Sequence, residues 1–203
     1  MTLIAPVFLS ILAFLVLTQT TMAQGNLVIN GGFDTDASGW VVTNVYVSGG
    51  GGYQSSLGNP PGSVVLYNLL YGSSHPSPTA SQEISGLTSG ALYIVSGDYR
   101  RIAGKNVTDI SFGVALDSIY LFETVVPTNS NWYGFSFDYT ATSTSAILSL
   151  SAQINGTDYS YAIDNISMQA VPEPSTLALS ALGGLLLAYR RLALPRFGGQ
   201  RWG

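Results

Sequence analysis

Residues 133–140, YGFSFDYT, place an aromatic side chain at every second position, with small or polar residues between them. Successive residues of a β-strand point to opposite faces of a sheet, so this stretch predicts a strand with one apolar and one polar face. Residues 110–116 and 148–151 repeat the alternation with other apolar residues. Together the three stretches predict a sheet-rich body.

The same pattern extends outward from these stretches over residues 24–170. About ten short strands can be drawn there, separated by clusters of Gly, Ser, Asn and Pro such as 49–52, 58–63 and 72–79. No long stretch has the spacing of an amphipathic helix. The fold class that we predict is all-β, an antiparallel β-sandwich of the jelly-roll type, in a single domain of roughly 150 residues with appendages at both ends.

The amino terminus has the pattern of an export signal. Residues 3–17 are almost wholly apolar, and small residues follow at Thr21 and Ala23. This pattern predicts a secretory signal peptide, residues 1–23, which signal peptidase removes after Ala23. No Lys or Arg precedes the apolar run, so an uncleaved amino-terminal anchor is the alternative. The chain has no cysteine, so no disulfide stabilises the fold.

Charge is divided unevenly along the chain. All eleven acidic residues lie between Asp34 and Glu173, where only Arg100, Arg101 and Lys105 balance them. The other four basic residues follow the carboxy-terminal apolar run. Nucleic-acid binding needs a Lys/Arg-rich surface, so the acidic body excludes nucleic acid as a partner.

Three stretches of the body carry a resemblance to a known family. They are NLVINGGFDTDASGW at 26–40, ASQEISGLTSGALYIVSGDYR at 80–100 and YAIDNISMQAV at 161–171. Together they resemble the galactose-binding-like jelly rolls that include several carbohydrate-binding modules, and residues 80–100 resemble a hairpin of that family. The resemblance implies a glycan-binding role for the body.

The same resemblance implies a structural calcium ion that joins the first turn to the last strand. Asp34 stands where the family usually has Glu, and Asp164 is the matching acid of the final strand. Calcium takes six to eight oxygen ligands, several of them carboxylates. The alternative is that Asp34 forms an Asx turn and Asp164 accepts hydrogen bonds from backbone N–H groups.

No catalytic motif is present. The one histidine, His75, has no cysteine or second histidine as a partner, and neither a nucleophile elbow nor a phosphate loop occurs. We therefore expect no enzyme, although acid pairs leave a polysaccharide hydrolase as an alternative. Sugars stack on aromatic rings, which makes Trp40, Trp132 and Tyr159 candidate ligand-binding residues. The alternative is that they fill the core or the strands.

The carboxy terminus has three parts. Pro172, Glu173 and Pro174 come first, then an uncharged apolar run at 176–189, then Arg190 and Arg191. The prolines favour extended backbone at Glu173. As a helix the run would span about 21 Å at ~1.5 Å per residue, short of the ~30 Å hydrocarbon core, so it predicts a marginal transmembrane helix. The arginines place its end in the cytoplasm.

This arrangement closely resembles the PEP-CTERM sorting signal, here residues 171–191, followed by a basic tail at 192–203. The resemblance implies an exosortase as partner, a Gram-negative host that makes exopolysaccharide, and a route from an inner-membrane intermediate to the cell surface or extracellular matrix. A plain single-pass anchor is the alternative. For the body, we expect a non-catalytic protein that binds extracellular polysaccharide. The alternative is a purely structural or adhesive matrix protein.

Overall fold

A computed structural model of the chain describes residues 25–68, 76–104, 111–153 and 159–172, together with Gly183, Gly184 and Leu186. One compact unit comprises Ala23–Val171. The remaining residues form a separate unit, of which only Pro172 and three helical residues are described. Within the described part of the chain no helix is long and apolar enough to span a bilayer.

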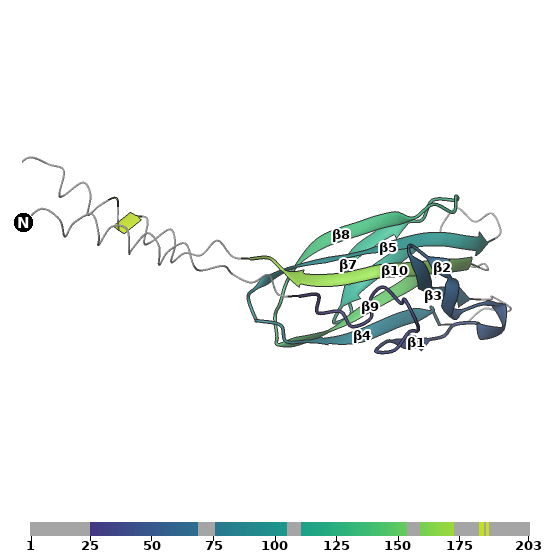
Figure 1. Ribbon diagram of the computed structural model, residues 1–203, viewed down its shortest axis with the longest axis horizontal. Helices are drawn as coiled ribbons and strands as arrows, with labels where there is room; N and C mark the ends of the chain where they lie inside the picture. Colours follow the sequence, from purple (N-terminus) through teal and green to yellow (C-terminus); the bar gives the residue numbers. More distant parts are fainter. Residues whose placement is uncertain are drawn as a thin grey trace, which may run out of the picture. The chain divides into compact units, whose positions relative to one another are not determined.

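The described residues form ten strands arranged in two five-stranded sheets, in which every strand pairing is antiparallel (Figure 1). Sheet A has the order β1 (Val41–Thr43), β4 (Thr79–Ser85), β9 (Ser145–Gln153), β6 (Ser111–Leu116) and β7 (Ile119–Val125). Sheet B has the order β2 (Gly52–Gly58), β3 (Pro61–Asn68), β10 (Tyr159–Ala170), β5 (Leu92–Gly104) and β8 (Tyr133–Thr140). A short 3-10 helix, η1 (Val47–Gly49), precedes β2. The predicted all-β jelly-roll sandwich is confirmed, and the alternating stretches lie in β6, β8 and β9.

The core lies between the sheets, where the apolar members of the alternating strands meet. The rings of Tyr99 on β5 and Phe112 on β6 stack with centroids 4.8 Å apart. A second pair across the sandwich joins Phe122 on β7 to Phe135 on β8 at 5.5 Å. Such pairs add about 0.5–1.5 kcal/mol beyond the burial of their area. These ring contacts fix how the two sheets pack against each other.

One expected local structure is wrong. Residues 80–100 do not form a hairpin, because β4 belongs to sheet A and β5 to sheet B. The connection between them crosses the sandwich and buries Leu87, which is 4% exposed, in the core. Packed sheets lie about 10 Å apart, so a crossing needs a longer connection than a two-residue hairpin turn. Residues 86–91 supply it.

Candidate functional site

The last strand carries a buried carboxylate at its centre. Asp164 on β10 is fully buried, next to a β-bulge at which Asn165 adopts a positive φ of 53°. The two oxygens of Asp164 accept the backbone N–H groups of Asn59, at 2.6 Å, and Asn165, at 2.7 Å. The carboxylate thereby fixes the tip of the β2–β3 hairpin to β10.

A second carboxylate lies directly beside it. Asp98 on β5 is in register with Asp164 on β10. The side-chain amide of Asn165 donates to Asp98 Oδ2 at 2.8 Å and to the carbonyl oxygen of Asn59 at 2.7 Å. One amide therefore links two neighbouring strands and the hairpin tip. Sequence reasoning missed Asp98, because only the strand register places it opposite Asp164.

These neighbours set the protonation behaviour of the site. Burial raises the pKa of Asp164 above the ordinary aspartate value of 3.8, and the nearby charges of Asp98 and Asp34 raise this pKa further. The two backbone N–H groups act in the opposite direction, but burial is the largest influence. The structure therefore brings the two predicted metal ligands close enough for the charge of Asp34 to raise the pKa of Asp164.

The Asx turn that was the alternative role for Asp34 belongs to a different residue. Asp36 accepts the backbone N–H of Ser38 at 2.8 Å and the side-chain amide of Asn30 at 3.1 Å. Its hydrogen bonds with Ser38 hold the pKa of this exposed carboxyl below the ordinary value. Asp34 itself follows the Gly-Gly-Phe turn, and its carbonyl accepts the Tyr53 hydroxyl at 3.5 Å.

The arrangement does not form a ready calcium cage. Among the described residues, no group of three or more His, Cys, Asp or Glu side chains is placed to share one metal ion. An N–H donor of Asn165 lies between the Asp98 carboxylate and the Asn59 carbonyl, where a cation would need oxygens only. Bound calcium stays a prediction, and no step of the function depends on it.

The stability of the body should depend on pH through this cluster. A carboxyl whose pKa is raised in the folded state stabilises the fold when protonated, and this contribution is lost as pH rises through the folded-state pKa. We expect the free energy of unfolding to increase as pH falls through the raised folded-state pKa of Asp164 toward the ordinary value of 3.8. Asp98→Asn should flatten the increase and raise stability at pH 7 by about 0.5–1 kcal/mol, because one like charge beside Asp164 is gone.

Urea unfolding over a pH series in chelator measures this dependence. Asp138→Asn is the matched control, since it removes one exposed acid of the same sheet. Equal slopes for the Asp98 and Asp138 variants would show that Asp98 has no special influence on the site. Added calcium at pH 7 tests the metal separately. A calcium-dependent rise in melting temperature supports the ion, and an unchanged temperature contradicts it.

The first of the three aromatic residues proposed to stack on a sugar, Trp40, is buried in the structure. Trp40 lies in the core, 8% exposed, with its ring 5.3 Å from Phe33. Its indole N–H donates to the carbonyl oxygens of Ile29 and Asn30 at 3.1 and 3.3 Å. The structure thus places Trp40 as a packing residue, and this corrects the stacking role expected for it.

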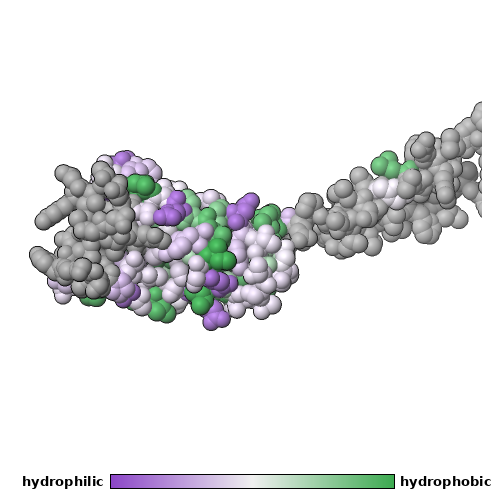
Figure 2. Space-filling view, turned by 180° about the vertical axis from the view of Figure 1, so that it is seen from behind, coloured by the Kyte–Doolittle hydropathy of each residue, from purple (hydrophilic) through white to green (hydrophobic). Residues whose placement is uncertain are grey.

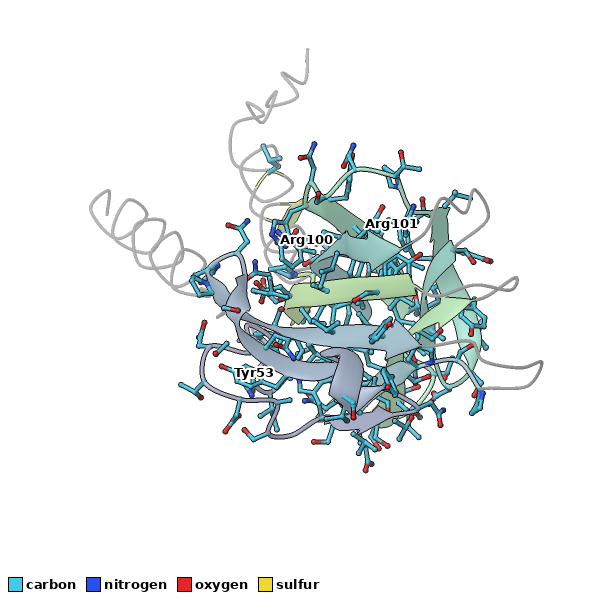
Figure 3. All side chains as sticks on the ribbon, turned by 90° about the vertical axis from the view of Figure 1, so that its right-hand side faces the viewer. Tyr53, Arg100 and Arg101 are labelled. Carbon is cyan, nitrogen blue, oxygen red and sulfur yellow. The ribbon has the colours of Figure 1, made fainter. Side chains whose placement is uncertain are left out.

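The other two aromatic candidates, Trp132 and Tyr159, lie at the ends of strands of sheet B. Trp132 is partly buried and lies under the Arg100 guanidinium, 5.2 Å from its ring centroid. Figure 3 shows Arg100 well apart from Tyr53, which packs against the core from β2. Tyr159 begins β10, where it pairs with Asn68 and Gly104, and its side chain lies outside the described residues.

A tyrosine that sequence reasoning missed lies on the outer face of sheet A. The ring of Tyr120 leans over Gly113, where a Cβ would come within 2.8 Å of its Cε1. Its hydroxyl lies 3.3 Å from that of Ser151, and the side chain is 48% exposed. Glycine at position 113 therefore leaves room for an aromatic ring across the sheet. The sequence IYLFETV of β7 shows no regular alternation. The outward position of Tyr120 therefore follows only from the register of β7 with β6.

Small and hydroxyl-bearing residues extend from that ring across the outer face of sheet A. Strand register places them on the same face of neighbouring strands: Thr79, Ser81, Ala115, Ser149 and Ser151. The charged residues of the described sheet A strands are Glu83 and Glu123, with no Lys or Arg among them. Exposed apolar side chains occur on sheet A as well, including Val41, Val125 and Ile147. Figure 2 shows one face of the body, on which green apolar residues lie among pale and purple ones.

Only part of the carboxy-terminal motif lies within the described structure. Val171 still donates its N–H to the Leu92 carbonyl at 2.9 Å, and the next residue, Pro172, is exposed. The other predicted sorting residues lie outside the described residues: Glu173, Pro174, Arg190 and Arg191. So does the predicted signal peptide at 1–23.

Comparison with known proteins identifies the carboxy terminus. Residues 170–192 match the PEP-CTERM protein-sorting motif, which indicates an exported protein with a carboxy-terminal sorting signal. Comparison with curated protein sequences gave no match.

Solved structures show the same fold in the body. A structure of TmCBM61 in complex with β-1,4-galactotriose is 17% identical with a TM-score of 0.52, over 71% of this chain and 98% of that one. The K3 cleaved adhesin domain of Lys-gingipain from Porphyromonas gingivalis is 14% identical with a TM-score of 0.51, over 72% and 98%.

The enzymatically active domain of tailspike protein 4 from bacteriophage CBA120 is also similar, at 14% identity and a TM-score of 0.51. This match covers 72% of the present chain but only 21% of the tailspike chain. At these identities the three likenesses establish the fold of the body.

Proposed function

We propose that the chain is a non-catalytic protein of the cell surface or extracellular matrix, whose β-sandwich binds exopolysaccharide. The observation that carries its destination is the sorting motif at residues 170–192, which begins at the last residue of β10. An exosortase processes the chain near Pro172–Glu173–Pro174, after signal peptidase has removed residues 1–23. Arg190 and Arg191 hold the inner-membrane intermediate with its end in the cytoplasm.

The arrangement around Tyr120 supports glycan binding by the body. Its exposed ring offers a flat apolar surface of the kind on which the C–H face of a sugar stacks. The neighbouring serine and threonine hydroxyls can exchange hydrogen bonds with sugar hydroxyls. A module of the same fold is recorded with β-1,4-galactotriose. Glu83 and Glu123 disfavour an anionic polymer, so we infer a neutral glycan.

We expect Tyr120→Ala to weaken binding about tenfold, which corresponds to ~1.4 kcal/mol, because the stacking surface is lost. Tyr120→Phe keeps the ring and loses only the contact with Ser151, so it should bind nearly as well as the parent chain. Calorimetric titration with the host's neutral exopolysaccharide measures the change. Trp132→Ala is the matched control, since Trp132 directly precedes β8 of sheet B. A larger loss in that variant than in Tyr120→Ala would move the site to the other sheet.

The same titration separates the remaining alternatives. A folded body without saturable binding to any host polysaccharide would be a structural or adhesive matrix protein. Release of reducing ends from the polymer would identify a hydrolase instead. Saturable binding without release supports the proposed function.

A further inference from the structure

Both ends of the body leave the β-sandwich at the same end. Near the amino terminus, Leu27 donates its N–H to the Met168 carbonyl at 2.9 Å. At the carboxy terminus, Val171 is bonded to Leu92. The turns at 86–91 and 141–144 lie at this end too, because they follow β4 and β8 and precede β5 and β9. We call this surface the proximal end.

The two turns form one continuous surface. Gly90 donates its backbone N–H to the Ala141 carbonyl at 2.7 Å, and Leu87 donates to the Thr144 carbonyl at 3.1 Å. The Ser89 hydroxyl adds a bond to the Thr142 carbonyl at 3.3 Å. These contacts hold the exposed hydroxyl side chains in place at the proximal end.

This surface has no formal charge in an otherwise acidic body. Residues 25–27, 86–91, 141–144 and 169–172 contain no Asp, Glu, Lys or Arg. The next acids are Glu83 on β4, Asp138 on β8 and the exposed Asp117 in the β6–β7 turn, which is hydrogen-bonded to Ile147 near the start of β9 at this same end. The two turns beside which the chain continues into the sorting motif therefore carry no acidic residue.

The sequence allows very little spacer after this surface. Only residues 172–175 separate Val171 from the apolar run that begins at Thr176. A fully extended chain covers at most ~3.6 Å per residue, so five steps reach about 18 Å. The headgroup layer on one side of a bilayer is roughly 5–8 Å thick. If the apolar run is inserted, the proximal end lies close to the headgroups.

We propose that the proximal end is a membrane-facing surface, which rests against lipid headgroups while the sorting segment is inserted in the bilayer. This inference depends on the insertion step of the proposed function. Anionic lipids act on charges near the surface by about 1 kcal/mol each, and this influence extends about 8–10 Å in salt. An uncharged, hydroxyl-rich surface avoids that repulsion. Contact between the proximal end and the headgroups keeps Pro172–Glu173–Pro174 near the membrane surface, where a membrane enzyme can reach it.

The absence of cysteine allows a direct test on the full chain. One cysteine is introduced at Ser89 and labelled with a fluorophore. The labelled chain is reconstituted in phosphatidylethanolamine–phosphatidylglycerol vesicles that contain a nitroxide-headgroup lipid. The matched control is Ser130→Cys, an exposed position between β7 and β8 at the opposite end of the sandwich. We expect strong quenching at position 89 and weak quenching at position 130.

Two further variants test whether the lack of charge and the short spacer keep the proximal end at the membrane. Thr88→Asp with Thr142→Asp adds acids to exposed proximal positions and should lower quenching to the level of position 130, with recovery in phosphatidylcholine vesicles. A Gly/Ser spacer of about 15 residues before Pro172, with an average reach of about 20 Å, should also lower it.

Equal quenching at positions 89 and 130 in chains that float with the vesicles would overturn the inference alone. Quenching at position 89 that persists with both the acids and the spacer would also overturn it. A chain that does not float with the vesicles would refute the insertion step, and the inference would fail with it.

Discussion

Gly31→Ala should prevent the β-sandwich from folding stably. A Cβ at this position would clash with the backbone oxygen of Ile166 on β10, well inside van der Waals contact. The backbone cannot retreat easily, because Ile166 donates its N–H to the Gly31 carbonyl at 2.9 Å. We expect a loss of about 3–5 kcal/mol, a large share of the ~5–15 kcal/mol that stabilises a typical domain.

The adjacent glycine supplies a matched control. A Cβ at Gly32 would meet only the carboxylate of Asp34, at 3.5 Å, which is ordinary contact. Gly32→Ala should therefore change stability little. Thermal unfolding followed by circular dichroism compares the two variants. If Gly31→Ala melted at the same temperature as Gly32→Ala, the close approach between the amino-terminal segment and β10 would be wrong.

This close approach explains why the Asn-Gly-Gly-Phe stretch accompanies the last strand. Gly31 admits the β10 backbone, and Phe33 next to it is fully buried. Asn26 strengthens the same junction, since its side chain accepts the N–H of Met168 at 2.9 Å. The resemblance noted in the sequence thus rests on a physical junction between the first segment and the final strand.

Alternation of side chains was sufficient to predict the fold class. It was not sufficient to predict which strands share a sheet. The stretch 80–100 shows the limit, because a hairpin and a crossing between sheets both bury one face of each strand. The strand pairing distinguishes them, because β4 pairs with β9 whereas β5 pairs with β10 and β8.

The candidate site residues likewise divide into those that local motifs predict and those that depend on strand pairing. Asp34 and Asp164 were found from short motifs, whereas Asp98 and Tyr120 needed the register of β5 with β10 and of β7 with β6. Trp40 was misplaced because its burial depends on a contact with Phe33 that no local spacing reveals. Residues defined by their partners across strands are the ones that sequence patterns miss.

Glu173→Ala should block carboxy-terminal processing almost completely and leave the body folded. The sheet ends just before this residue, because Val171 is bonded to Leu92 and Pro172 has no N–H to continue the pairing. The two flanking prolines disfavour a helix and favour extended backbone at Glu173. An extended segment with one acidic side chain is a suitable substrate for a membrane protease or transpeptidase.

Pulse-chase labelling with cell fractionation in a host that has an exosortase measures the effect. The parent chain should shorten and leave the inner membrane, while Glu173→Ala should accumulate there at full length. Glu123→Ala, which removes an exposed acid of β7, should be processed like the parent chain. Normal processing of Glu173→Ala would refute the assignment of Pro172–Glu173–Pro174 as the recognition element. Accumulation of the parent chain itself would favour a permanent anchor, because the motif would then hold the protein at the membrane without releasing it.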